Sequence, residues 1–137
     1  MRKNRLIMAL PLIVIIAVFI IKQESKGDEN TGSNVLNLNS DNFSNEVLDA
    51  NIPVIVDFYA TWCGPCKKLS PVIEELSKEY EGKIKFGKID VDKNEEIAAQ
   101  YNIQSIPHLI IFIDGKAQKS VIGLHSKDDL KKYLDNL

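Results

Sequence analysis

From residue 35 onward, the spacing of apolar positions switches repeatedly between two patterns, which predicts alternating strands and helices. The clearest strand is 53–60, an apolar run in which only Asp57 is polar, as expected for a strand buried on both faces. The longest helix is predicted at about 63–80, where Pro71 should cause a bend. In chain order we expect strands at 35–38, 53–60, 84–91, 108–113 and 117–122, and helices after Ser40, at 63–80, at 95–101 and after Ser126.

This order of elements predicts a single α/β domain, a mixed central sheet with helices on both faces. Right-handed crossovers make the first strands parallel, and the two-residue turn Asp114-Gly115 adds an antiparallel edge through a hairpin. The hydroxyls of Ser40 and Ser126 are the expected N-caps of the first and last helices. Asp128 follows Ser126 closely, which favours a helix start because acidic groups stabilise the positive end of the helix dipole.

A different pattern occupies the N-terminus, where Arg2, Lys3 and Arg5 precede sixteen uncharged residues, 6–21. This pattern predicts a short membrane-directing helix within 1–26, which acts as an uncleaved signal anchor or, alternatively, as a cleavable signal peptide. Residues 27–34 are expected to be a linker and 35–137 the folded domain. Because the positive residues keep the N-terminus in the cytoplasm, we expect a single-pass cell-membrane protein with an extracytoplasmic domain, secreted if the signal is cleaved.

The distribution of charge argues against a nucleic-acid partner. The net charge of the 137 residues is only −2, but residues 1–26 carry five Lys and Arg against one acidic residue, whereas 27–137 carry twelve against eighteen. An acidic body with scattered lysines lacks the cationic cluster that displaces counterions from phosphates. We therefore expect that the protein does not bind nucleic acid.

The candidate reactive site is the segment Trp62-Cys63-Gly64-Pro65-Cys66, which lies where the predicted buried strand ends and the long helix begins. A helix N-terminus favours negative charge, so the pKa of the Cys63 thiol should be lowered and Cys63 should be the nucleophile. Cys66 lies one turn on, where it can attack a mixed disulfide and act as the resolving thiol. Pro65 suits the first turn of a helix, and Gly64 lets the two sulfur atoms approach.

Two other interpretations of the cysteine pair are open. A purely structural disulfide across so small a loop would stabilise the fold by only about 2 kcal/mol on the chain-entropy formula. A zinc site would need two more ligands, and only His108 and His125 could supply imidazoles. The redox pair is the preferred interpretation, with no metal and no cofactor.

Asp57 is the second candidate, because a carboxylate inside an apolar strand is rare unless it is paired or functional. Burial beneath the cysteines would raise its pKa and let it take the proton of Cys66. Lys88, in a neighbouring strand, is the expected partner; the alternatives are an exposed Asp57 and an ordinary solvated Lys88. A third candidate is Ile106-Pro107, since a proline opening a strand marks a turn and, when cis, exposes the backbone of the residue before it to a peptide.

Together these residues resemble the thioredoxin family over 35–137. The matching segments are, in chain order, Val56-Asp57-Phe58-Tyr59-Ala60, Trp62 to Cys66, Pro71, Lys88, Ile106-Pro107, Asp114-Gly115 and Gly123. The resemblance implies a thioredoxin fold, a dithiol/disulfide active site, oxidised protein disulfides as substrates, Asp57 and Lys88 as a buried proton-handling pair, and a cis peptide at Pro107. It also implies that the substrate docks on an apolar patch formed by Trp62, Gly64, Pro65, Ile106, Pro107 and Gly123.

The chain departs from the family at three places. His108 stands where Thr usually follows the cis proline, Tyr59 stands where Trp is common, and the segment 6–21 directs the chain to a membrane. A reducing dithiol outside the cytoplasm would need electrons from an integral-membrane thiol carrier. The leading interpretation is therefore a membrane-tethered extracytoplasmic protein-disulfide reductase; the alternatives are a thiol oxidase or isomerase of the same fold and a non-catalytic substrate-binding or chaperone module.

Overall fold

The computed structural model describes residues 32–137. The predicted segment 1–26 and most of the predicted linker lie outside these residues. Within 32–137, no helix combines the length and the apolar composition that crossing a membrane requires.

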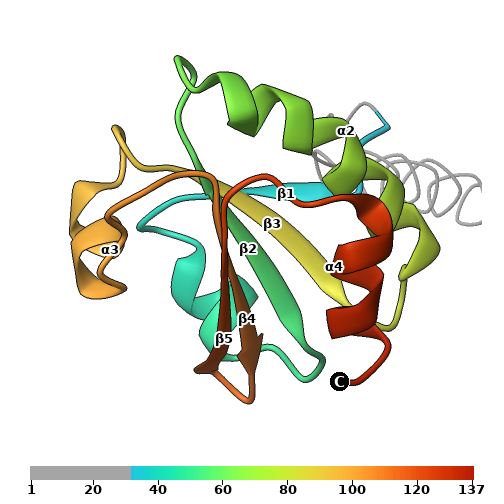
Figure 1. Cartoon of the computed structure of the whole chain (residues 1–137). Coiled ribbons are helices and arrows are strands. Elements are labelled where there is room, and N and C mark those ends of the chain that lie inside the picture. Colours follow the sequence, from blue (N-terminus) through green and yellow to red (C-terminus); the bar gives the residue numbers. More distant parts are fainter. Residues whose placement is uncertain (1–31) are drawn as a thin grey trace, which may run out of the picture. The chain divides into compact units, whose positions relative to one another are not determined.

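The domain is a five-stranded mixed sheet covered by helices on both faces (Figure 1). The elements, in chain order, are β1 (Val35–Leu38), the short π-helical segment η1 (Ser44–Leu48), β2 (Val54–Tyr59), α2 (Gly64–Glu79), β3 (Lys85–Asp90), α3 (Glu95–Gln100), β4 (His108–Ile113), β5 (Lys116–Ile122) and α4 (Lys127–Leu134). The predicted α/β fold class and the order of elements are confirmed.

The strand order is β1-β3-β2-β4-β5, with β1, β3 and β2 parallel. β4 already runs antiparallel to β2, and β5 runs antiparallel to β4. The antiparallel part of the sheet therefore begins one strand earlier than the hairpin alone indicates. β2 lies at the centre, and this position explains its nearly continuous apolar sequence.

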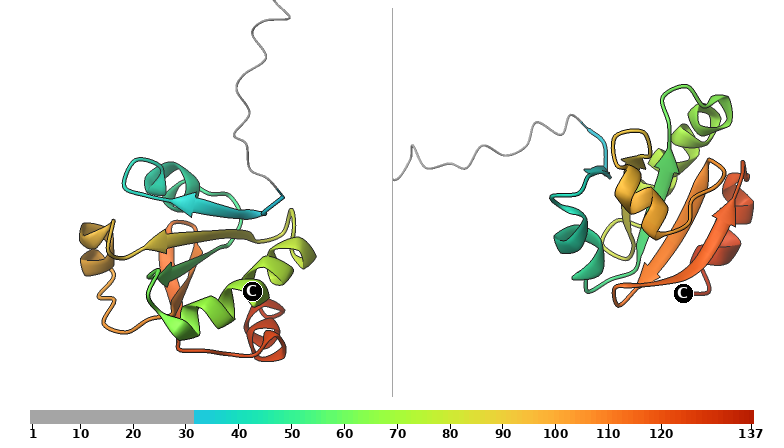
Figure 2. Two further views of the ribbon diagram at one scale, coloured as in Figure 1. Left: turned by 90° about the horizontal axis from the view of Figure 1, so that it is seen from above. Right: turned by 90° about the vertical axis from the view of Figure 1, so that its left-hand side faces the viewer.

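Side chains alternate along β2 between two apolar clusters, one on each face of the sheet. Ile55 packs with residues of α2 and α4, whereas Val56 and Phe58 pack with η1 and α3. Asp57 has the parity of Ile55 and so lies on the face covered by α2. The two views of Figure 2 show α2 and α4 on one side of the sheet and η1 and α3 on the other.

The expected N-cap at Ser40 is wrong: the N-cap residue of η1 is Phe43, which makes no side-chain cap hydrogen bond, and the side chain that holds the preceding turn is that of Asn39. Its Oδ1 accepts the backbone N–H groups of Asp41 at 2.9 Å and Asn42 at 3.1 Å. In turn, the Oδ1 atom of Asn42 accepts the backbone N–H of Asn39 at 2.8 Å. This reciprocal pair has the form of a capping box, but it closes the turn before η1 rather than the start of η1 itself.

The cap at Ser126 is confirmed: its hydroxyl accepts the N–H of Asp129 at 3.2 Å. The turn between β4 and β5 is also as expected, with positive φ at Asp114 (52°) and Gly115 (75°). A Cβ at Gly115 would lie 2.5 Å from the carbonyl oxygen of Leu48, so this turn packs closely on the end of η1.

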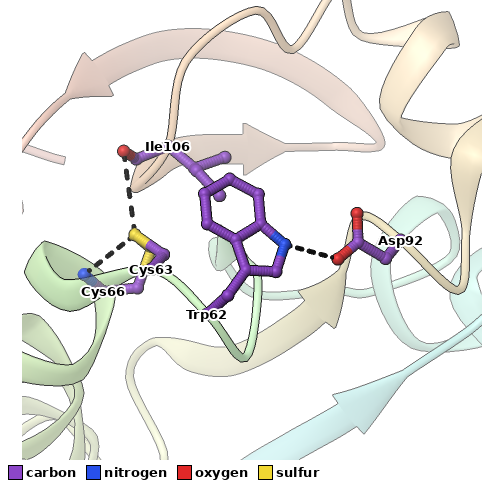
Figure 3. Close-up of a disulfide and its surroundings, with 5 residues drawn as sticks. All are labelled: Trp62, Cys63, Cys66, Asp92 and Ile106. Atoms are coloured by element: carbon purple, nitrogen blue, oxygen red, sulfur yellow. Dashed lines mark hydrogen bonds between the residues drawn. A yellow bond between two sulfur atoms is a disulfide. The ribbon is translucent and has the colours of Figure 1, made fainter.

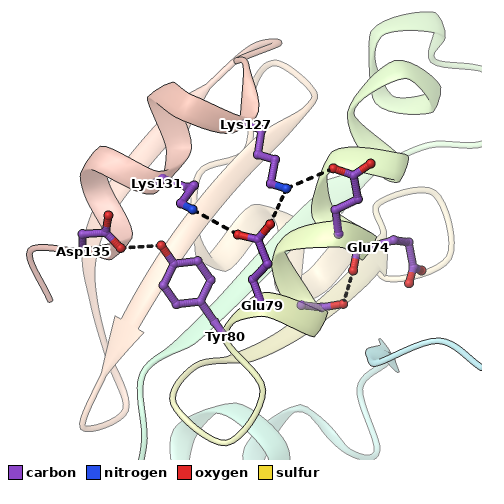
Figure 4. Close-up of polar contacts among 8 residues, drawn as sticks. Glu74, Glu79, Tyr80, Lys127, Lys131 and Asp135 are labelled. Carbon is purple, nitrogen blue, oxygen red and sulfur yellow. Dashed lines mark hydrogen bonds and ion pairs between the residues drawn. The ribbon is translucent and has the colours of Figure 1, made fainter.

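Helices α2 and α4 are joined on their outer surfaces by polar contacts (Figure 4). Lys127 pairs with Glu75 at 3.3 Å and also with Glu79, which Lys131 contacts at 3.2 Å. The hydroxyl of Tyr80 donates to Asp135. Exposed pairs of this kind contribute little each, so the apolar contacts beneath them hold α4 in place.

Candidate active site

The two cysteines lie at the start of α2, as expected, and form a disulfide with a Cα–Cα distance of 5.3 Å. Cys63 is the N-cap residue with extended backbone angles, and Cys66 lies in the first turn. Gly64 and Pro65, which lie between them, are exposed. Pro65 has no backbone N–H, but the helix loses no hydrogen bond there, because the first N–H groups of a helix have no partner within it. The helix continues through Pro71.

The first turn of α2 directs a hydrogen-bond donor at Cys63. The backbone N–H of Cys66 donates to Cys63 Sγ at 3.2 Å, and the same sulfur lies 3.9 Å from the carbonyl oxygen of Ile106 (Figure 3). In the reduced protein the N–H and the positive end of the helix dipole would both favour the thiolate of Cys63 over its thiol. Both cysteines are buried against Ala60 and Ile106.

Trp62 is held beside the disulfide by a residue that the sequence analysis did not identify. Its side chain is 69% exposed, and its indole Nε1 donates to Asp92 Oδ2 at 2.8 Å (Figure 3). Asp92 follows β3, and its own N–H donates to Asp90 Oδ1 at 2.9 Å. An exposed indole fixed in this way offers a broad apolar face at low entropic cost to a docking chain.

Asp57 is buried, with 4% of its surface exposed, which rejects the alternative that it lies exposed at a strand end. Burial raises the pKa of its carboxyl from 3.8 to about 7, and the positive charge of Lys88 opposes part of this rise. The two residues are direct partners in the parallel register of β2 and β3. Lys88 is half-buried, and its Nζ lies 5.9 Å from the centroid of the Tyr59 ring.

A pocket of about 320 Å³ connects this pair to the second cysteine. Its lining residues are Asp57, Tyr59, Ala60, Thr61, Cys66, Lys67, Ser70 and Lys88. The side chain predicted to accept a proton and the thiol predicted to lose one therefore share one pocket, as the sequence analysis anticipated.

The peptide between Ile106 and Pro107 is cis, as expected from the family resemblance. Pro107 itself is buried and Ile106 is half-buried. The carbonyl of Pro107 accepts the N–H of Gly123 at 2.8 Å, where Gly123 adopts a φ of 90° that suits a residue without a side chain. Two of the predicted docking residues are thus joined by a backbone hydrogen bond.

Two further apolar side chains flank Gly123 and were absent from the predicted patch. Ile122 is 56% exposed and Leu124 is 49% exposed. Their apolar character was visible in the sequence, but an isolated Ile or Leu beside a glycine gives no signal of exposure. Through the bond between Gly123 and Pro107, they lie next to a segment that contains two of the predicted docking residues.

His108 is buried at the start of β4, with its ring 6.4 Å from that of Phe58 in an edge-on arrangement. Within residues 32–137 neither ring nitrogen has a hydrogen-bond partner. Burial lowers the pKa of this imidazole below its usual 6.5, so the neutral form is favoured. In the same part of the chain, no three His, Cys, Asp or Glu side chains are arranged to hold a metal ion.

An apolar replacement of His108 should stabilise the fold. We expect His108→Met to raise the free energy of unfolding by about 1 to 3 kcal/mol at pH 7, because two unpartnered nitrogens leave the interior. Since the folded pKa is lowered, the wild-type chain should also lose stability as the pH falls below about 6.5, and the variant should lack this loss. Urea unfolding of both proteins at pH 7 and pH 5 would measure this; an equal difference at the two pH values would contradict the lowered pKa.

Comparison with known proteins agrees with this geometry. The family model described as Thioredoxin matches residues 34–136. The chain is 43% identical over 100 residues to the thioredoxin of Rickettsia bellii (73% of this chain, 95% of that protein) and 46% identical over 101 residues to thioredoxin C-2 of Corynebacterium nephridii (74% and 94%). It is 47% identical over 93 residues to thioredoxin 1 of a Nostoc species (68% and 87%). With its Cys-x-x-Cys pair at the start of α2, the chain belongs to the thioredoxin family and is a thiol–disulfide oxidoreductase.

Proposed function

We propose that this chain is a protein-disulfide reductase, tethered to the membrane with its catalytic domain outside the cytoplasm. The observation that carries the chemical part is the N–H of Cys66 directed at Cys63 Sγ from the first turn of α2. Membership of the thioredoxin family supports disulfides of proteins as the substrates.

In the proposed reaction the reduced enzyme supplies two electrons. The thiolate of Cys63 attacks one sulfur of a substrate disulfide, a bond forms between them, and the other substrate sulfur leaves as a thiolate. The thiolate of Cys66 then attacks Cys63 Sγ, the Cys63–Cys66 disulfide forms, and the remaining substrate sulfur leaves with its electron pair. The substrate gains two thiols and the enzyme ends as the disulfide seen in the structure.

Asp57 is the proposed proton acceptor for the second step. Cys66 must lose its thiol proton to become a nucleophile, and a carboxylate whose pKa is about 7 is suited to accept that proton near neutral pH. Lys88 would then keep the Asp57 pKa from rising further, because its ammonium favours the ionised carboxyl.

The side chains near the disulfide form the proposed docking surface for the substrate chain. Trp62 and Ile106 would contact it on either side of Cys63, and the segment through Gly123 would extend the contact. The exposed Gly64 and Pro65 would complete the surface, whereas the predicted docking residue Pro107 is buried and would act only through the backbone around it. The exposed Ile122 and Leu124 support this assignment, since exposed apolar groups near a reactive sulfur favour association with an apolar partner.

The proposed location rests on the sequence before the domain. Three basic residues followed by the uncharged run 6–21 favour a cytoplasmic N-terminus and a translocated domain. Outside the cytoplasm the Cys63–Cys66 disulfide would have to be reduced again by an integral-membrane thiol carrier. Mass spectrometry of the chain from membrane, medium and cytoplasmic fractions tests this proposal. An intact chain in the membrane supports the anchor, a shortened chain in the medium would contradict the tether, and recovery in the cytoplasm would contradict the location.

The reduction potential separates a reductase from an oxidase or isomerase. We expect equilibration with glutathione to give a potential close to the value of about −270 mV known for thioredoxin. A value near −120 mV, typical of a strong oxidant, would make electron flow towards substrates unfavourable and would contradict the reductase proposal, because about 30 mV is a factor of about ten in the equilibrium constant.

A further inference from the structure

The pocket over Asp57 contains polar side chains for which the redox steps have no use. Thr61, Lys67 and Ser70 line it together with Asp57 and Cys66. Ser70 lies four residues after Cys66 on the same face of α2, and it is exposed. It therefore stands between solvent and the inner part of the pocket, whereas Asp57 lies at the buried end.

The buried carboxyl of Asp57 needs a route for its proton. Within residues 32–137 its Oδ1 has no hydrogen-bond partner and no contact with bulk solvent. A proton that it takes from Cys66 in one turnover must leave before the next, and protons move along chains of groups that both donate and accept hydrogen bonds. The lining of this pocket is mostly apolar, but it includes the hydroxyls of Tyr59, Thr61 and Ser70, and its volume of about 320 Å³ is large enough to hold several water molecules for such a chain.

Ser70 is suited to this route in a way that the lysines are not. A hydroxyl both donates and accepts, whereas the ammonium groups of Lys67 and Lys88 only donate. The other hydroxyls of the lining belong to Tyr59, the last residue of β2, and to Thr61, two residues later, so Ser70 is the lining hydroxyl on the helix that carries Cys66.

We infer that Ser70 is a positioning residue, which orders water at the mouth of this pocket and so aids the exchange of the Asp57 proton with solvent. The inference rests on the proposed role of Asp57 as the proton acceptor for Cys66. It adds to the Cys63–Cys66 pair a residue on α2 that influences release of the substrate through the proton of Asp57.

Two variants of nearly equal shape test the hydroxyl directly. Val and Thr have similar shapes, and both are β-branched in a helix, so Ser70→Val and Ser70→Thr differ chiefly in one hydroxyl. In rapid-mixing experiments with a disulfide peptide, we expect Ser70→Val to slow release of the substrate from Cys63 about tenfold, part of the roughly 10²- to 10⁴-fold that a positioned acid–base group supplies. Ser70→Thr should stay within about twofold of the wild-type rate, and neither variant should change the rate at which the mixed disulfide forms. Equal release rates for the two variants would overturn the inference.

Two controls separate this inference from the proposed function. Ser40→Val changes an exposed serine outside the pocket and should alter neither step. In an Asp57→Asn background, Ser70→Val should have no further effect on release, because both changes act on the same proton; full, additive slowing would show that Ser70 acts elsewhere. Failure of the wild-type chain to form any mixed disulfide at Cys63 would instead contradict the proposed function.

Discussion

The Asp57→Asn variant is expected to be more stable than the wild-type oxidised protein by about 4 kcal/mol at pH 8. The difference arises because the folded protein must keep an ionised carboxylate in a buried site, where its pKa is raised from 3.8 to about 7. Asn has the same shape and carries no charge, so it avoids this cost. Lys88 reduces the cost but does not remove it.

The pH dependence of this gain has a definite sign. Because its folded pKa is raised, Asp57 binds a proton more tightly in the folded state than in the unfolded state. Its contribution to stability is therefore lost as the pH rises from about 4 to about 7, and it is constant above that. The two proteins should be closest in stability near pH 4 and furthest apart above pH 7.

Urea unfolding of both proteins at pH 4, 6 and 8 checks this expectation. His108 has a lowered pKa and acts in the opposite direction, but it is present in both proteins and so cancels in the difference. A difference that does not change with pH would show that Asp57 titrates normally. The stabilised variant should also release mixed disulfides more slowly, which would show that the buried carboxyl lowers stability but accelerates the second step.

The Cys66→Ser variant should accumulate a covalent complex with its substrate. Cys63 can still attack, but the hydroxyl that replaces the Cys66 thiol cannot displace the substrate sulfur, so turnover should fall by more than about 100-fold. Incubation with a disulfide-containing protein, followed by non-reducing electrophoresis and mass spectrometry, would detect the adduct at Cys63. Absence of any adduct, with full turnover retained, would contradict the assigned roles.

Cys63→Ser is the matched control for that experiment. It should form no adduct and should reduce no insulin disulfide, because the attacking sulfur is missing. A chain that serves only as a binding or chaperone module would instead bind its partners equally well in all three forms, through the surface around Trp62, and would show no disulfide reduction even in the wild-type form.

Much of the fold could be predicted because local and tertiary requirements agree. The bounds of β4 follow from an apolar run that begins after Pro107 and ends at the Asp114-Gly115 turn. The start of α2 follows from Pro65 next to the Cys63 N-cap, because the first turn of a helix is where a missing N–H removes no hydrogen bond. The burial of Asp57 could be predicted because the apolar residues on both sides of it fix its strand at the centre of the sheet.

Other features depend on contacts between distant parts of the chain. Asp92 meets the indole of Trp62 thirty residues away, and nothing in the local sequence around either residue indicates the pairing. The direction of β4 depends on how the segment after α3 returns across the sheet. The role of Asn39 was missed for a local reason: three polar residues in succession, 39–41, could each accept N–H groups of the turn before η1, and only the backbone decides between them.

The acidity of Cys63 is the property on which the proposed chemistry depends most directly. The rate of alkylation of the reduced Cys66→Ser protein, followed against pH, measures it for Cys63 alone. We predict a midpoint well below about 8.5, the value for a free cysteine, because the N–H of residue 66 and the helix dipole stabilise the thiolate. A midpoint at or above that of a free cysteine would contradict the account.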